Sequence, residues 1–224
     1  MRGAIAAMAG AVLWAAVMAA QNPPAASTLL VENDRVHVSQ VTLHPGVAPP
    51  PVTSEDVPLL IITLNADAPA PARTASVLSD PPSWSFGSVQ YLSTPGAATS
   101  KGRDSHKAVR QIWIKLKAAS ASVPFVKDAV RLDPAHNTVV FENDRVRVVH
   151  LHFPPGESGP VVDKRARVIA VLTNSHAVVT RPDGTTAVRD GKAGAVSYSN
   201  GGSQATLNAG STLLENVVVE LKSK

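Results

Sequence analysis

The pentapeptide Glu-Asn-Asp-Arg-Val occurs twice in this chain, at residues 32–36 and again at 142–146, which is 110 positions later. Each copy is followed at the same distance by a Pro-Gly step, at 45–46 and at 155–156. Two identical phrases with the same downstream spacing predict two copies of one structural unit. The repeat constrains the fold strongly, because corresponding strands must then occupy corresponding positions.

The correspondence continues to the end of each copy. Tyr91 matches Tyr198, and the closing Lys-Leu-Lys at 115–117 matches Glu-Leu-Lys at 220–222. The offset falls from 110 to 107 and then to 105, as expected if loops change length while strands keep theirs. The predicted organisation is a signal peptide at 1–20, a flexible lead-in at 21–28, a first lobe at 29–117, a linker at 118–137 and a second lobe at 138–224.

The first 20 residues have the pattern of a secretory signal. Arg2 precedes an uncharged, mostly apolar run at 3–20, and small residues near its end suit a signal peptidase. A retained membrane anchor is the alternative, because the run is near the lower length limit for a span. We therefore expect a periplasmic or secreted protein with no membrane contact after cleavage. The absence of cysteine excludes a lipid anchor on cysteine, disulfides and thiol chemistry.

The charge balance of the mature chain is mildly basic. Removal of Arg2 leaves 20 basic and 17 acidic residues, a net charge of +3. Basic residues cluster loosely at 101–110 and at 164–167, with no stacking aromatics among them, so we expect solvated faces and no binding to nucleic acid. The sequence leaves dimerisation open.

Short apolar runs punctuated by Gly, Pro, Asn and Asp predict an all-β protein. Arg-Pro-Asp-Gly-Thr at 181–185 predicts a hairpin turn, and one helical turn is expected near 127–132. The expected strands are 29–31, 36–43, 59–64, 89–92 and 112–116 in the first copy, and 139–141, 146–153, 168–173, 177–180, 195–198 and 213–221 in the second.

Two further local predictions come from comparing the copies. Within 36–43 and again within 146–153 the apolar positions change phase midway, which predicts a β-bulge inside each of these strands. The charged residues of the repeated pentapeptide precede a strand in both copies. There Asn-Asp suits a turn and the arginine could pair with an acid across it, so a structural role is expected.

The order of these motifs resembles the small secreted cupin domains. It runs from Glu-Asn-Asp-Arg-Val-Arg-Val through Pro-Pro-Gly-Glu, Pro-Asp-Gly and Asn-x-Gly to the closing Val-Glu-Leu-Lys. The second copy fits over 141–222, and the first fits more loosely over 31–117. The resemblance implies an all-β fold of two tandem cupin barrels, each a double-stranded β-helix of the jelly-roll type.

The resemblance also implies where a cupin would hold a divalent metal, and metal ligands are missing there. The two alternate histidines map to Val162 and Lys164 in the second copy and to Val52 and Ser54 in the first. The later histidine maps to Gln204 and to a position near Ala97, and the acid maps near Val168 or Ile169. Valine and alanine cannot ligate a metal, so we expect neither a metal nor another cofactor.

His150 and His152 offer an alternative metal pair, since alternate residues of a strand share a face. Leu151 and Phe153 take the opposite face and look buried, so we expect the two histidines to face solvent or the other lobe. The remaining histidines, His37, His44, His106, His136 and His176, are interpreted as ordinary surface or loop residues.

The favoured interpretation is a non-catalytic cupin-like protein that binds a small polar or anionic ligand in the second lobe. Lys164 and Gln204 stand at former ligand positions, and Arg167 is placed at the rim. A buried lysine needs a partner, which is either a bound anion or an internal acid such as Glu157. The alternatives are a cupin-type isomerase or dioxygenase with atypical ligands, and an envelope protein-interaction module. No catalytic residue is identified.

Overall fold

The computed structural model describes residues 25–65, 86–97, 108–117 and 126–222, so the expected signal peptide lies outside the described residues. Within these ranges no helix has the length and hydropathy needed to cross a membrane. The first lobe contains β1 (Ala26–Glu32), β2 (Val36–Leu43), β3 (Pro51–Val52), β4 (Leu59–Asn65), β5 (Phe86–Leu92), β6 (Gly96–Ala97) and β7 (Val109–Leu116). The second contains α1 (Ala129–Leu132), β8 (Asn137–Glu142), β9 (Val146–Phe153), β10 (Val162–Lys164), β11 (Arg167–Val171), β12 (Ser175–Thr180), β13 (Thr186–Gly191), β14 (Val196–Ser199), β15 (Gly202–Asn208) and β16 (Leu214–Leu221).

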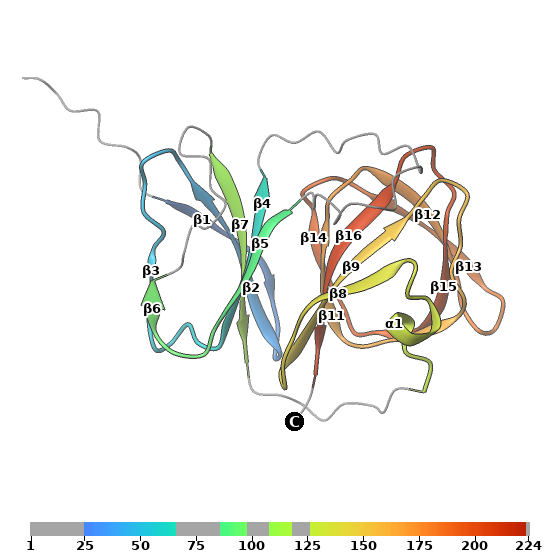
Figure 1. Cartoon of the computed structure of the whole chain (residues 1–224), viewed down its shortest axis with the longest axis horizontal. Coiled ribbons are helices and arrows are strands. Elements are labelled where there is room, and N and C mark those ends of the chain that lie inside the picture. Colours follow the sequence, from blue (N-terminus) through green and yellow to red (C-terminus); the bar gives the residue numbers. More distant parts are fainter. Residues whose placement is uncertain (1–24, 66–85, 98–107, 118–125, 223–224) are drawn as a thin grey trace, which may run out of the picture.

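The two lobes have the same strand order in their main sheets. The first-lobe sheet runs β1-β2-β7-β4-β5, and the second-lobe sheet runs β8-β9-β16-β11-β14. The second lobe adds a facing sheet, β10-β15-β12-β13, and the described part of the first lobe pairs β3 with β6. Figure 1 shows the two main sheets side by side at the centre of the molecule. The prediction that 36–43 and 146–153 are equivalent strands is confirmed.

The strand register reproduces the alignment of the two copies. Val36 pairs with Leu116 at one end of the β2–β7 ladder, and Val146 pairs with Leu221 in the β9–β16 ladder. The opening strands are therefore 110 positions apart and the closing strands 105, as the sequence comparison indicated. Loop lengths differ between the lobes while strand pairing is kept.

The repeated pentapeptide forms the same turn in both lobes. The Asn33 side-chain oxygen accepts hydrogen bonds from the backbone N–H groups of Arg35 and Val36, at 2.8 and 2.9 Å. Asn143 does the same in the second lobe, with both distances 2.9 Å. The predicted structural role of Asn is thus confirmed.

The acid that opens each pentapeptide pairs with a lysine, and not with the arginine expected. Lys117 bonds to Glu32, and Lys222 lies 2.5 Å from Glu142. Both lysines belong to the closing Leu-Lys of their copy, so each pair ties the first hairpin of a lobe to its last strand. This long-range role explains why acid and lysine recur together in the two copies.

The expected bulges lie one strand away from where they were predicted. β2 is in continuous register with β7, and the shift occurs in β1, between Leu29 and Val31. The second lobe has the equivalent shift in β8, between Val139 and Phe141, while β9 is regular against β16. Both copies do carry a matched bulge, but the prediction for β2 and β9 was wrong.

A change of buried face explains the apolar phase change within β2. Val36 and Val38 belong to a hydrophobic cluster that both lobes share, whereas Val41 and Leu43 belong to the first lobe's own cluster. Successive residues point to opposite faces of a sheet, and alternate residues share a face. In the first half of β2 the buried residues therefore lie on the outer face, against the second lobe, and in the second half they lie on the inner face. The buried residues of β9 change face in the same way.

The cluster between the lobes is the largest among the described residues. It joins residues of β2, β4 and β7 to residues of β9, β11 and β16. Each fully buried Val, Leu or Ile contributes roughly 1.5–3 kcal/mol relative to exposure. The sheets therefore bury their outer faces against each other, and each inner face lines the lumen of its own barrel.

Local predictions elsewhere are confirmed with shifted boundaries. The 181–185 turn joins β12 to β13, and Gly184 there has a φ of 83°. The helical turn is α1. It lies within the segment expected as a linker, so the second lobe begins before β8. β1 begins at Ala26, inside the segment expected as a lead-in. β10, β13 and β15 were not among the expected strands, because their apolar residues are few and do not alternate clearly.

Candidate ligand cavity in the second lobe

The two sheets of the second lobe enclose a cavity of about 480 Å³. Arg189 on β13 and Ser197 on β14 line it and are exposed, which places the rim at these two edge strands. Ala129 of α1 also lines it, so the end of the expected linker forms part of the wall. This volume lies within the range of small-molecule sites.

The three predicted ligand-binding residues all line this cavity. Lys164 lies at the end of β10, Arg167 begins β11, and Gln204 lies on β15. β10 and β15 are paired, with Val162 opposite Gln204 and Lys164 opposite Gly202. The mapping of cupin ligand positions onto this sequence therefore led to residues that meet in space.

The cavity is electropositive at this point. Burial, together with the neighbouring Arg167 guanidinium, lowers the pKa of Lys164 to about 8, although Glu220 and Asp133 act in the opposite direction. Burial likewise lowers the pKa of Arg167 to about 10 against the opposing charge of Glu220. Arg167 is 8% exposed. The prediction of a solvated basic face at 164–167 is therefore wrong for Lys164 and Arg167.

Neither cation is neutralised by a direct contact. Among the residues that the structure describes, the Lys164 side chain makes no hydrogen bond or ion pair, and the buried Nη1 of Arg167 has no partner there. Glu157, the internal acid considered for Lys164, lies 2.8 Å from His136. The alternative in which Lys164 pairs with an internal acid such as Glu157 is not realised, because Glu157 is exposed and its carboxylate contacts the His136 ring.

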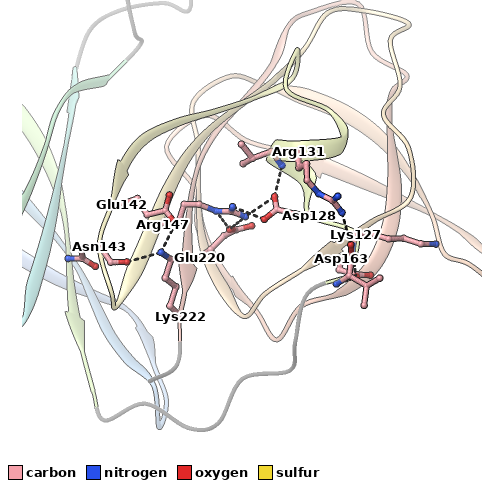
Figure 2. A network of polar contacts seen from close by, with 11 residues as sticks. Lys127, Asp128, Arg131, Glu142, Asn143, Arg147, Asp163, Glu220 and Lys222 are labelled. Atoms are coloured by element: carbon pink, nitrogen blue, oxygen red, sulfur yellow. Dashed lines mark hydrogen bonds and ion pairs between the residues drawn. The ribbon is translucent and has the colours of Figure 1, made fainter.

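The one buried acid on the cavity wall is already engaged. Glu220 accepts a hydrogen bond from Arg147 Nε at 2.7 Å and forms an ion pair with Arg147 Nη2 at 2.6 Å, and Arg147 also donates to Asp128 at 2.8 and 3.2 Å. Figure 2 shows Arg147 reaching between these two carboxylates. Asp128 caps α1 by accepting from the Val130 N–H. Glu220 can therefore offset the charge of Lys164 and Arg167 only at longer range.

Asp163, next to Lys164, fastens the segment before α1 to β10. Its carboxylate accepts from the backbone N–H of Val126 and Lys127 and from the Ser203 hydroxyl, at 3.2, 2.8 and 2.7 Å. These bonds keep the pKa of Asp163 below its usual value, chiefly through Ser203 and the Lys127 N–H. The α1 segment is thus held against the barrel at both Asp163 and Arg147 (Figure 2).

The positions to which the cupin resemblance assigns metal ligands hold several apolar side chains and no histidine. Val162 and Val52 are buried apolar residues on β10 and β3. Val168 belongs to the cluster between the lobes, while Ile169 lines the cavity. Within the described ranges, no group of three or more His, Cys, Asp or Glu side chains could hold a metal ion. Ser54 follows β3 and is exposed, and Ala97 ends β6.

His150 and His152 lie on the outer face of β9, as expected, but His150 is enclosed there and His152 is half-buried. His150 is 3% exposed and its Nε2 lies 2.7 Å from Glu215, which is 1% exposed. Both histidines share the outer face of β9 with Val146 and Val148, because they keep the same alternation, so they point away from the cavity. Burial is the main cause that lowers the pKa of His152, and the nearby His150 and His136 rings lower it further.

His136 also differs from the expected loop histidine. It is 9% exposed, and its ring stacks on the Phe153 ring with the two ring centroids 4.1 Å apart. Its two ring nitrogens contact Asp133 and Glu157. His176 is exposed and pairs with Asp190, in agreement with the prediction for it. His106 lies outside the described residues.

Sequence reasoning missed Arg147 and Glu220, the pair that controls the charge of the cavity wall. Alternation along β16 was the available signal, since Leu214, Asn216, Val218 and Glu220 all line the cavity. Their inward direction depends on which face of β16 meets the other lobe, and nothing local in the sequence specifies that.

The fold is all-β, with two tandem barrels of the cupin type. No family model matches the sequence, and no curated protein matches it. Among solved structures, AerE from Microcystis aeruginosa is 12% identical with a TM-score of 0.51, over 90% of this chain and 94% of that one. A cupin 2 conserved barrel domain protein from Leptotrichia buccalis is 12% identical (TM-score 0.44, 90% and 91% covered). A cupin domain from Bordetella pertussis is 24% identical (TM-score 0.37, 39% and 92% covered). These likenesses concern the fold.

Proposed function

We propose that this protein is a non-catalytic, degenerate bicupin whose second lobe binds a small polar or anionic ligand. The observation that carries the proposal is the pair of cationic side chains, Lys164 and Arg167, on one cavity without a directly paired carboxylate in the part of the chain that the structure describes. A buried charge without a partner is costly. A bound anion would stabilise both side chains at once, and Gln204 would add a hydrogen-bond donor or acceptor.

The residues at the former metal positions support binding over metal chemistry. In the second lobe these are Val162, Lys164 and Gln204, of which one is apolar and one is a cation. A cation at a metal position would repel a divalent metal and attract an anion. The same substitution that removes the chemistry expected of a cupin therefore supplies a different ligand preference.

Calorimetric titration of the purified protein tests the proposal. Acetate and inorganic phosphate are expected to bind with a stoichiometry of one per chain and to raise the thermal unfolding midpoint. Glycerol serves as a neutral probe and is expected to do neither. Absence of anion binding would contradict the proposal. Stoichiometric bound metal in elemental analysis of the same sample would favour the alternative of a cupin-type metalloenzyme with atypical ligands.

We also propose that the protein is exported, because of the uncharged apolar run at 3–20. The mature chain is expected to begin at Ala20 or Gln21. Sequencing the N-terminus of protein recovered from outside the cytoplasmic membrane checks this cleavage point. An intact Met1 on membrane-bound protein would contradict export with cleavage and support a retained anchor.

A further inference from the structure

The cavity of the second lobe is layered, with charge at one level and apolar surface at the next. In the β9–β16–β11 register, Arg147, Glu220 and Arg167 lie side by side on one level. Lys164 lines the same cavity, at the end of β10 and three residues before Arg167 begins β11. This end of the cavity is therefore its ionic end.

The next level of the same three strands carries only aliphatic side chains. Two residues further along each strand, Val149, Val218 and Ile169 lie side by side, and all three line the cavity. Successive inward residues of a strand are about 7 Å apart. From the facing sheet, Ala177 and Val179 add further buried apolar wall. An apolar part of the cavity thus begins two residues along the strands from the charged level.

We propose that the ligand is a small amphipathic carboxylate, with its carboxylate between Lys164 and Arg167 and an aliphatic or aromatic body against Val149, Val218 and Ile169. This inference rests on the proposed function and narrows its ligand class. An inorganic anion would occupy the ionic end and leave most of the 480 Å³ unused. A neutral polyol would gain nothing from the cations and would place part of its hydroxyl groups against aliphatic surface, although Ser197 and Thr206 line the cavity beside Ile169 and Val179.

A homologous series of ligands tests the chemistry directly on the full-length protein. The probes are acetate, butanoate, hexanoate and octanoate, with inorganic phosphate and hexan-1-ol as controls, all measured by calorimetric titration. Each methylene buried on the apolar level is expected to tighten binding by about fourfold until the compartment is filled. Hexan-1-ol, which lacks the charge, is expected to bind far more weakly than hexanoate.

A matched pair of variants locates the apolar level. Val218→Thr keeps the shape of the side chain but adds a hydroxyl to the cavity wall. It is expected to weaken hexanoate binding roughly threefold to tenfold while leaving acetate binding unchanged, because only the longer ligand reaches this level. Val188→Thr, on an exposed position of β13 that does not line the cavity, is the control and is expected to change neither.

The outcomes separate the inference from the function on which it rests. Phosphate and all carboxylates binding with equal affinity would overturn the amphipathic ligand and leave anion binding intact. Hexan-1-ol binding as tightly as hexanoate, or no binding by any probe, would overturn both. The chain-length series uses the unaltered protein, so it decides the question even if Val218→Thr fails to fold.

Discussion

Replacing Lys164 with methionine is expected to weaken anion binding by roughly 30-fold or more, because truncating one partner of a buried charge pair costs about 2–5 kcal/mol. Folding should not suffer. Lys164 is half-buried and has no directly paired acid among the described residues, and exchanging such an unpaired charge for an apolar group of similar shape is neutral or stabilising. Calorimetric titration with acetate and urea unfolding at pH 7 measure the two effects separately.

The pH dependence of stability gives an independent signature of Lys164. Its folded-state pKa of about 8 lies below the ordinary value of 10.5, so the unfolded chain binds more protons between these two values. The stability of the unaltered protein should therefore rise with pH across that window, relative to Lys164→Met, and the difference should be constant below pH 8. Anion affinity should fall over the same range as the ammonium loses its proton.

Lys127→Met is the matched control, because the Lys127 side chain is exposed and only its backbone joins the contacts around Asp163. It should change neither binding nor stability. A loss of roughly 3–5 kcal/mol in Lys164→Met would mean that an internal acid pairs with the lysine after all. No change in either property would place the ammonium in solvent and refute the binding site.

Replacing Arg147 with methionine is expected to cost about 3–5 kcal/mol of unfolding free energy. Arg147 is 8% exposed and bridges Glu220, which is 5% exposed, to Asp128. Its loss leaves Glu220 buried and charged without its closest partner, and it frees the N-cap of α1 from the barrel (Figure 2). Urea unfolding at pH 7 measures the loss. Arg131→Met, on an exposed position of α1, is the control and should cost little.

A second substitution shows whether the loss of stability in Arg147→Met comes from the unpaired Glu220 charge or from lost packing. Arg147→Met combined with Glu220→Gln should be more stable than Arg147→Met alone, because the amide removes the unpaired buried charge. If the double variant is no more stable, the loss comes from packing and not from charge. Burial opposes ionisation of Asp128, but the hydrogen bonds and charge of Arg147 outweigh it and lower the pKa of Asp128 below 3.8. Part of the stabilisation is therefore present above that pH and lost as the pH falls.

Much of the fold follows from short-range chemistry that a sequence displays. Asn33 and Asn143 form identical turns because the side-chain oxygen reaches N–H groups two and three residues ahead, a contact that needs no distant partner. The Pro-Gly steps place glycine at φ 77° and 80°, at Gly46 and Gly156, where other residues are strained. Because the repeat carries these signals twice, it predicted equivalent strands and their offsets correctly.

The cavity residues could be predicted for a different reason. Lys164 and Gln204 were found by aligning this chain with the pattern of a cupin, in which position along the strand determines which side chains meet, and Arg167 was added as a nearby residue of the rim. Alternation within β10 and β15 then suffices to bring the first two together. Their shared charge environment was not predictable, because it depends on Arg147 having already engaged Glu220.

The turns, the strand equivalences and the positions of the cavity-lining residues follow from the sequence, since each depends on neighbours along the chain or across one ladder. Only the tertiary structure decided which faces are buried. His150 is enclosed, and β2 changes phase without a bulge, because the outer faces of two sheets meet, and the residues that bury each face come from the other half of the chain. Burial is a property of what packs against a surface, and the alternation within a strand shows that two faces differ without showing which of them will be covered.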